Sequence, residues 1–323
     1  MSMMVDESDE LTHSDIEEML LAVNGRIVGL DTDDNEYDSI LPIWDKELTR
    51  TTLLDKKISS SEAEKSASEL VWYHKAFEYW ESDTNCPITD DGVLGGYGAV
   101  TPMDTRDSNN FLNTLLSKFP LLRLNRVADC GAGIGRVAKN LLLPRCQVVD
   151  LVEQSPRLLA AAPVYLAGAK ISEFPPTGDL SDPSSTFRQI GTPEATALVN
   201  RVNLVNVGLQ DFAPVAGTYD VIWIQWVIGH LHDLDCIQFF RRCAAGLTEN
   251  GLIVLKDNVL LQHDLTFLWD KSDSSVARHK KYMKLLLTLA GLQVVQEAFQ
   301  TDFPEELFPV MLWAITSAPP RIA

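Results

Sequence analysis

The feature that most constrains this chain is a short apolar run that leads directly into three closely spaced glycines, at residues 127–136 (Val-Ala-Asp-Cys-Gly-Ala-Gly-Ile-Gly-Arg). The apolar run predicts a buried strand. The glycines after it permit backbone conformations and close approaches that a side chain would prevent. A helix that starts at such a turn presents unpaired N–H groups to a ligand. The segment therefore predicts a strand, a turn and a helix, with a ligand bound at the turn.

The spacing of these glycines narrows the kind of ligand. Gly131, Gly133 and Gly135 form GxGxG, which is neither a P-loop, since no Gly-Lys-Ser/Thr follows, nor the GxGxxG of dinucleotide enzymes. Glu153 ends the next predicted strand, 22 residues after Gly131, close to where a carboxylate would bind ribose hydroxyls. This two-part match predicts a nucleoside-containing cofactor. Asp129, just before the glycines, favours S-adenosylmethionine over a dinucleotide.

The same strand, turn and helix pattern repeats along the rest of the chain. Apolar runs predict strands at 127–130, 147–152, 202–207, 219–223 and 252–256. Helical spacing predicts helices at 108–124, 156–166, 236–245 and 282–290, and two last runs, 293–299 and 311–315, predict an antiparallel hairpin. We therefore expect an α/β fold of the Rossmann-like type, with a mostly parallel seven-stranded sheet.

Composition divides the chain into an extension and a folded domain. Residues 1–70 hold 18 acidic and 6 basic side chains, which is −12 of the total formal charge of −18, and we expect them to be mostly disordered. The folded domain is expected at 71–323. It contains a helical cap with a glycine-rich loop at 71–124, the α/β core at 125–323 and a surface insertion at 171–200 that is rich in Pro, Ser, Thr and Gly.

Charge, cysteine and hydropathy patterns exclude several classes of partner. An acidic chain repels phosphate backbones, so nucleic acid is not an expected partner. Five cysteines without CxxC spacing and scattered histidines without HExxH predict reduced thiols and no metal site. The acidic N-terminus and the absence of a long apolar run predict no membrane association and a cytoplasmic or nuclear location. The oligomeric state is left open, and a monomer is compatible with the sequence.

Four motifs together resemble the eukaryotic protein N-terminal alpha-N-methyltransferases. They are Asp-Cys-Gly-Ala-Gly-Ile-Gly-Arg at 129–136, Gly-Leu-Gln-Asp-Phe at 208–212, the run from Tyr219 to Leu231, and Leu-Lys-Asp-Asn at 255–258. The resemblance extends from about Tyr73 to the C-terminus. It implies a class I methyltransferase fold, S-adenosylmethionine as cofactor, and methylation of the free α-amine of proteins that begin Xaa-Pro-Lys or Xaa-Pro-Arg.

The resemblance also implies the cofactor-binding residues. Arg136 would pair with the methionine carboxylate of the cofactor, Glu153 would accept hydrogen bonds from the ribose diol, and Gln210 would lie near the adenine edge. The full implied set is Gly131, Arg136, Glu153, Gln154, Ser155, Leu209, Gln210 and Gln225. Glu153 stands where the family usually has Asp, and the longer carboxylate is still expected to reach the diol.

The implied peptide-binding residues lie in other segments. Trp80 and Trp226 resemble aromatic walls for the substrate proline, and Asn258 an amide that binds its backbone. Leu94 and Gly95 belong to a loop over the peptide channel, while Asp270, Asp273 and Ser275 would face the amine and the cationic third residue. The implied catalytic residues are His230, Asp273 and Asn258, because an α-ammonium with a pKa near 8 must lose a proton before it attacks a methyl group. Phe308 replaces a family tyrosine, which removes one hydroxyl from this site.

Other interpretations of the same residues remain open. His230 follows an apolar strand and could be a buried structural histidine, and Asp273 in its polar segment could cap a helix. The function could also be that of a binding protein that retains the cofactor pocket without turnover, of a methyltransferase acting on a small molecule or RNA, or of an NAD-dependent oxidoreductase. The GxGxG spacing argues against the last of these, and the acidic residues of the implied peptide site argue against RNA.

Overall fold

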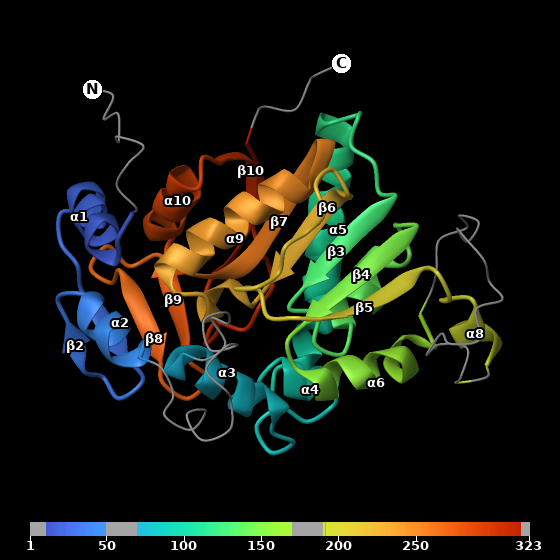
Figure 1. Cartoon of the computed structure of the whole chain (residues 1–323), viewed down its shortest axis with the longest axis horizontal. Coiled ribbons are helices and arrows are strands. Elements are labelled where there is room, and N and C mark those ends of the chain that lie inside the picture. Colours follow the sequence, from blue (N-terminus) through green and yellow to red (C-terminus); the bar gives the residue numbers. More distant parts are fainter. Residues whose placement is uncertain (1–10, 50–69, 170–189, 191, 318–323) are drawn as a thin grey trace, which may run out of the picture.

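The computed structural model describes residues 11–49, 70–169, 190 and 192–317 of the chain. A twisted sheet of eleven strands runs through this part, with helices on both faces (Figure 1). Seven strands form the core in the order β5-β4-β3-β6-β7-β11-β10. All neighbours pair in parallel except β11, which is antiparallel to both β7 and β10. The predicted fold class, including the antiparallel C-terminal hairpin, is confirmed.

The core strands are β3 (Arg126–Cys130), β4 (Val148–Glu153), β5 (Val202–Asn206), β6 (Tyr219–Gln225), β7 (Leu247–Leu260), β10 (Gln293–Phe299) and β11 (Val310–Thr316). Strands β6 and β7 extend beyond their predicted carboxyl ends. Strand β6 continues to Gln225, and β7 runs for 14 residues, far beyond the predicted 252–256. Because β6 extends, Gln225 lies at the carboxyl end of the sheet, where open α/β sheets bind ligands.

Helices cover both faces of the core sheet. Figure 1 shows α9 and α10 in front of it and α5 behind it. The helices of the folded domain are α3 (Val71–Glu81), α4 (Asp90–Val93), α5 (Thr101–Lys118), α6 (Pro156–Leu166), α8 (Pro193–Thr196), α9 (Asp233–Gly246) and α10 (Lys280–Leu289), with short turns η2 (Gly98–Val100), η3 (Ala138–Leu142) and η4 (Ile228–His230). Two apolar clusters lie on opposite faces of the sheet: one joins it to α9 and α10, and the other joins it to α5, η3 and α6.

Residues 11–49 form a folded N-terminal lobe, so the prediction of disorder is wrong for this segment. The lobe consists of α1 (His13–Asn24), β1 (Gly29–Asp31), β2 (Glu36–Tyr37) and α2 (Leu41–Glu47). Its apolar residues Ile16, Leu20 and Trp44 are buried against the main core. Composition misled the prediction because acidic side chains on the outer surface mask a small set of apolar positions at helical spacing.

A hairpin that the sequence analysis did not predict joins β1 to the core sheet. This hairpin consists of β8 (Phe267–Asp270) and β9 (Ser275–His279), where the sequence predicted a polar loop or a helix cap. Strand β1 pairs in parallel with β8, and β9 pairs in parallel with the end of β7. The helix predicted at 108–124 begins seven residues earlier, at Thr101. Most of the predicted insertion at 171–200 lies outside the described residues.

The described residues include no helix that is both long and apolar enough to cross a membrane. Within the same part of the chain, no group of three or more His, Cys, Asp or Glu side chains is arranged to hold a metal ion. All five cysteines are buried and unbridged.

The buried carboxylate of Asp129 gives a prediction about pH and stability. Its Oδ2 accepts a hydrogen bond from the N–H of Ala138 at 3.0 Å, which links β3 to the helix after the glycine turn. Burial, the largest effect, raises the pKa of Asp129 to about 7. The native state therefore binds this proton more tightly than the unfolded chain does, and the carboxylate costs stability as pH rises from about 4 to 7.

We expect Asp129→Asn, which keeps the acceptor oxygen, to remove that cost. As pH rises from 4 to 7, the free energy of unfolding of the variant, relative to that of wild type, should increase by up to roughly 4 kcal/mol. Urea denaturation at several pH values measures it, with the exposed Asp45→Asn as a control. Identical pH slopes for Asp129→Asn and wild type would contradict a buried charge at this position.

Candidate functional site

Two cavities meet at the carboxyl ends of the parallel strands. The glycine-turn cavity encloses about 890 Å³ beside Gly131, Glu153 and Gln225. The hairpin cavity encloses about 1220 Å³ beside β8, β9 and the end of β7. Their shared wall consists of Trp80, Val93, Leu94, Trp226, Val227 and His230. A ligand in one cavity therefore lies next to a ligand in the other.

The glycine turn leaves space that a side chain would fill. Gly131 has φ of +72°, and a Cβ at this position would lie 2.6 Å from Cβ of Val227. Gly133 and Gly135 also have positive φ, of 55° and 87°. Gly131 and Gly133 line the floor of the cavity, where left-handed glycines permit the close approach that a nucleoside cofactor requires, whereas a Cβ on Gly135 would lie 3.1 Å from Leu151.

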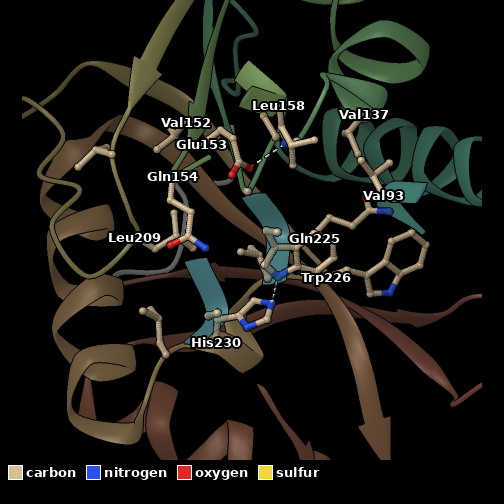
Figure 2. A pocket seen from close by; sticks show the side chains of 18 of the residues that line it. Val93, Val137, Val152, Glu153, Gln154, Leu158, Leu209, Gln225, Trp226 and His230 are labelled. Atoms are coloured by element: carbon tan, nitrogen blue, oxygen red, sulfur yellow. Dashed lines mark hydrogen bonds between the residues drawn. The ribbon is translucent and has the colours of Figure 1, made fainter. Parts of the chain in front are cut away.

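Glu153 closes the other side of this turn. Its Oε2 accepts from the N–H of Gly133 at 2.9 Å (Figure 2), and its Oε1 accepts from the N–H of Ser155 at 2.8 Å. Burial raises its pKa above the usual value, while these backbone hydrogen bonds act in the opposite direction. Each oxygen keeps a second lone pair, so the carboxylate can still accept from a ligand hydroxyl.

A buried charged cluster stands behind the cavity. Asp104 of α5 pairs through Oδ2 with Nη1 of Arg136 at 2.6 Å, and through Oδ1 with the ammonium of Lys256. The amide of Gln225 donates to both carboxylate oxygens at 2.8 and 3.0 Å. The indole of Trp223 donates to Oε1 of that amide at 2.9 Å, which fixes its orientation. Four segments therefore converge on one carboxylate.

This cluster holds more cations than anions. Asp104 carries one negative charge, whereas Arg136 and Lys256 carry one positive charge each, and all three are almost fully buried. Burial would raise the pKa of Asp104, but the two cations together lower it; burial lowers the pKa of Lys256. Arg136 and Gln225 line the glycine-turn cavity. The surplus positive charge at its wall fits a ligand that carries a carboxylate.

Seven of the eight predicted cofactor residues line the glycine-turn cavity, namely Gly131, Arg136, Glu153, Gln154, Leu209, Gln210 and Gln225. Figure 2 shows Gln154 and Leu209 on one side of it, Val93 and Val137 on the other and His230 at one end. Ser155 does not line it. Its hydroxyl caps α6 by accepting from the N–H of Leu158 at 3.1 Å, and it donates to Glu81 at 2.5 Å. Ser155 therefore positions Glu153 from behind.

All of the predicted peptide residues line the hairpin cavity, namely Trp80, Leu94, Gly95, Trp226, Asn258, Asp270, Asp273 and Ser275. Phe308 joins them and is 42% exposed. The side-chain amide of Asn258 makes no hydrogen bond with any described residue, and neither does the buried Oδ1 of Asp273. Both residues line the cavity, and the free amide of Asn258 suits a polar ligand, whereas Oδ1 of Asp273 is buried beneath the cavity surface.

His230 lies between the two cavities in a defined tautomer. Its Nε2 accepts from the indole N–H of Trp80 at 3.1 Å, because an indole nitrogen is only a donor. Its Nδ1 lies 3.1 Å from the carbonyl oxygen of Ser274, which is only an acceptor, so Nδ1 carries the proton. The imidazole is therefore neutral in this arrangement, and its lone pair is occupied.

Two more carboxylic acids shape the hairpin cavity. Burial raises the pKa of Asp273, whereas a hydrogen bond from Ser275 lowers it. Burial also raises the pKa of Asp257 to about 6, although its oxygens accept from the N–H groups of Asn258 and Ile228 at 2.7 and 3.3 Å. With Asp270, three carboxyl groups line one cavity, and a cationic ligand would relieve their mutual repulsion.

Trp226 is the strained residue of the site. Its φ is +52°, a conformation that costs a large side chain of the order of 1–3 kcal/mol. The indole faces both cavities, and the Arg136 guanidinium and the Lys256 ammonium lie 5.3 and 5.9 Å from its ring centroid. This strained conformation therefore places a flat aromatic wall at the junction of the cavities.

Several site residues were missed from the sequence. Asp104 lies on the buried stripe of α5 with Ser108, Phe111, Leu112 and Leu115, so helical periodicity extended towards the N-terminus would have found it. Lys256 ends the apolar run 252–256 and lies within β7, and a lysine in that position needs a buried anion. Tyr79 and Tyr97, which also line the hairpin cavity, lie in the aromatic helix and the glycine-rich loop that the sequence predicted, whereas Phe303 left no local signal.

Comparison with known proteins gives a family match. Residues 68–316 match the model of the family described as "AdoMet dependent proline di-methyltransferase". Alpha N-terminal protein methyltransferase 1 of Dictyostelium discoideum is 39% identical over 292 residues, which is 89% of this chain and 90% of the relative. N-terminal Xaa-Pro-Lys N-methyltransferase 1 of Mus musculus is 38% identical over 250 residues, 76% of this chain and 96% of the relative.

A solved structure agrees with this match. A SAM-dependent methyltransferase of Leishmania major superimposes with a TM-score of 0.69 and is 33% identical. The alignment covers 90% of this chain and 96% of that chain. The similarity therefore includes nearly the whole of both proteins.

The Asp104 cluster yields a prediction about stability. Asp104→Asn leaves Arg136 and Lys256 buried without their anion, so we expect the free energy of unfolding to fall by about 3–5 kcal/mol. The matched control is Asp302→Asn, which breaks an exposed pair with Arg106 at 2.9 Å. It should change stability much less. Denaturant titration of both variants measures this, and equal small losses would mean that the cluster contributes little.

Proposed function

Because this chain belongs to the family of AdoMet-dependent proline di-methyltransferases, we propose that it methylates the free α-amino group of proteins that begin Xaa-Pro-Lys or Xaa-Pro-Arg. The observation that carries the proposal is the contact between two unlike cavities. One has a glycine floor and a surplus cation, and the other has three carboxyl groups. A methyl donor and a cationic peptide would meet beside His230.

The glycine-turn cavity has the donor set that S-adenosylmethionine requires. Bound there, the cofactor supplies an electrophilic methyl group on a sulfonium sulfur. Arg136 would pair with its carboxylate, since its side chain lines this cavity and its Nη1 is held by Asp104. Glu153 would accept from the ribose hydroxyls, and the glycines of the turn leave room for the nucleoside. Leu209 and Gln210 would lie beside the adenine.

The hairpin cavity would bind the peptide. Trp80 and Trp226 provide flat surfaces for the proline ring, and the free amide of Asn258 can bind the peptide backbone. Asp270 and Asp273 would attract the lysine or arginine at the third position. Oδ1 of Asp270 already accepts from the N–H and hydroxyl of Ser272 at 2.8 and 2.6 Å, which leaves Oδ2 for the ligand.

We further propose that Asp273 is the first acceptor of the ammonium proton. Its Oδ1 is buried without a partner, whereas Nε2 of His230 already accepts from Trp80. Its raised pKa brings the carboxylate closer to the range in which a general base is effective. His230 would orient Trp80 through that hydrogen bond, and becomes a base only if the indole moves away. Alignment of the peptide α-nitrogen with the methyl group would supply the rest of the rate enhancement.

The setting of the enzyme is proposed on the same grounds. Five buried, unbridged thiols are typical of the reducing cytoplasm or nucleus. The three carboxyl groups of the hairpin cavity favour a protein N-terminus over a nucleic acid. The partners are therefore proteins whose processed N-termini carry a cation at the third position.

The first test is methylation of synthetic peptides. We expect mass increments of one or more methyl groups on a peptide that begins Ser-Pro-Lys in the presence of S-adenosylmethionine, and a much lower rate on Ser-Pro-Glu, with the difference shrinking as salt rises. An α-acetylated Ser-Pro-Lys peptide is the control for the site of transfer. Equal rates on the lysine and glutamate peptides would refute charge recognition, and no transfer to any peptide would refute the proposed activity.

A second test concerns the proton. Asp273→Asn keeps the shape but removes the charge, so we expect single-turnover methylation to slow by at least ~10²-fold with cofactor affinity unchanged. Because the pKa of Asp273 is raised, wild-type activity should decline on acidification at a higher pH than an exposed carboxylate would give, and the variant should lack this decline. His230→Asn should slow turnover less. A variant Asp273→Asn with a wild-type rate at every pH would exclude Asp273 as the base.

A further inference from the structure

The N-terminal lobe is attached to the hairpin that lines the hairpin cavity. Strand β1 pairs with β8 at three positions, from Gly29 opposite Phe267 to Asp31 opposite Trp269. The attachment continues on both sides: the N–H of Thr266 donates to the carbonyl of Val28 at 2.7 Å, and the N–H of Thr32 donates to the carbonyl of Trp269 at 3.1 Å. Figure 1 shows the lobe beside β8, at the edge of the sheet.

A second attachment reaches β9. The indole of Trp44 donates to Asp233 at 3.0 Å, and Asp233 also accepts from Nε of Arg278 at 3.0 Å and from the hydroxyl of Tyr282 at 2.7 Å. Arg278, in β9, is buried and donates to the carbonyl of Leu231. The lobe therefore pairs directly with β8, which carries Asp270, and is linked through Asp233 to β9, which carries Ser275.

Lys271 lies between these strands and faces the lobe. In sequence it follows Asp270 and precedes Asp273 by two residues, yet it does not line the hairpin cavity as they do. Its ammonium pairs with Oδ2 of Asp31 at 3.0 Å and with Asp33. The only lysine of the hairpin 267–279 is thus held on the side away from the peptide carboxylates.

Asp31 is fixed independently of this lysine. Its Oδ1 accepts from the N–H groups of Asp33 and Asn35 at 2.9 and 3.0 Å, and its Oδ2 accepts from the hydroxyl of Tyr37 at 2.9 Å. The side chain is 1% exposed. Burial alone would raise its pKa, but hydrogen bonds from Asn35 and Lys271 keep the pKa well below the usual range. The Asp31 carboxylate is therefore held in place by the lobe itself and is available to pair with Lys271.

A released Lys271 would compete with the substrate. It is joined by one peptide bond to Asp270, so its effective concentration at the peptide carboxylates would be of the order of millimolar. The third residue of the peptide is proposed to bind the same carboxylates with its own cation. An internal lysine at this concentration would weaken binding of the peptide without any change in its contacts.

We propose that residues 11–49 determine the charge of the hairpin cavity, because Asp31 and Asp33 hold Lys271 away from Asp270 and Asp273. The N-terminal lobe is then a specificity-determining part of the enzyme, although the family match begins only at residue 68. The proposal rests on the proposed recognition of a cationic third residue.

The test compares Asp31→Asn/Asp33→Asn, Lys271→Gln and the triple variant that combines them. Asn at position 31 keeps an acceptor for the N–H groups of Asp33 and Asn35, so the loop is expected to fold. With a Ser-Pro-Lys peptide and saturating S-adenosylmethionine, the double variant should raise KM at least fivefold with little change in kcat. Lys271→Gln alone should stay within twofold of wild type. The triple variant should return to within twofold, because the competing cation is gone.

The control is Glu18→Gln/Asp45→Asn, which removes the same charge from exposed positions of the lobe and should leave KM unchanged. A double variant with wild-type KM would overturn the proposal. So would a raised KM that Lys271→Gln fails to rescue, since the lobe would then act only through folding. If wild type methylates no Xaa-Pro-Lys peptide, the proposed function fails; if wild type is active and the variants behave alike, only this inference fails.

Discussion

The carboxylate of Asp104 is the contact on which the active site depends, because it joins α5 to the glycine turn, to β6 and to β7 through Arg136, Gln225 and Lys256. Burying two cations with one anion costs free energy that an apolar core would not incur. A ligand carboxylate would supply the second anion and balance the two buried cations. The cluster would then be most stable with the cofactor bound, which couples folding of the cap to occupancy of the site.

The junction of the two cavities orders the chemistry in space. Trp80 from α3, His230 from η4 and the carbonyl of Ser274 beside β9 form one hydrogen-bonded chain. This chain crosses the boundary between the cofactor and the peptide, so a shift of the cap helix would change the tautomer and accessibility of His230. Asp273 keeps an unpaired oxygen nearby. On the proposed mechanism, His230 would position the wall and Asp273 would accept the proton.

Local sequence patterns predict some elements of the fold and miss others. Glycine turns and apolar runs locate the seven core strands, because the alternation of strand and helix is encoded within each 30-residue unit. Residues 11–49 and the β8–β9 hairpin escaped prediction because their apolar residues are few and become buried only against distant segments, such as Trp44 against Asp233 and Gly29 against Phe267. The exposed, polar residues dominate the composition of these stretches, so the composition gives no sign of the apolar residues that pack against the core.

By itself, the sequence determined the cofactor class, since GxGxG and Glu153 are local features whose chemistry depends on residue type and spacing, and the resemblance of its motifs to a known family implied most of the wall residues, including Gln225 and Asn258. Only the tertiary structure decided how they are joined. The partners of Arg136 and Lys256, the tautomer of His230 and the side to which Lys271 points all depend on residues far apart along the chain. Hydrogen bonds and ion pairs act over a few ångströms of space, and sequence spacing alone does not specify such distances.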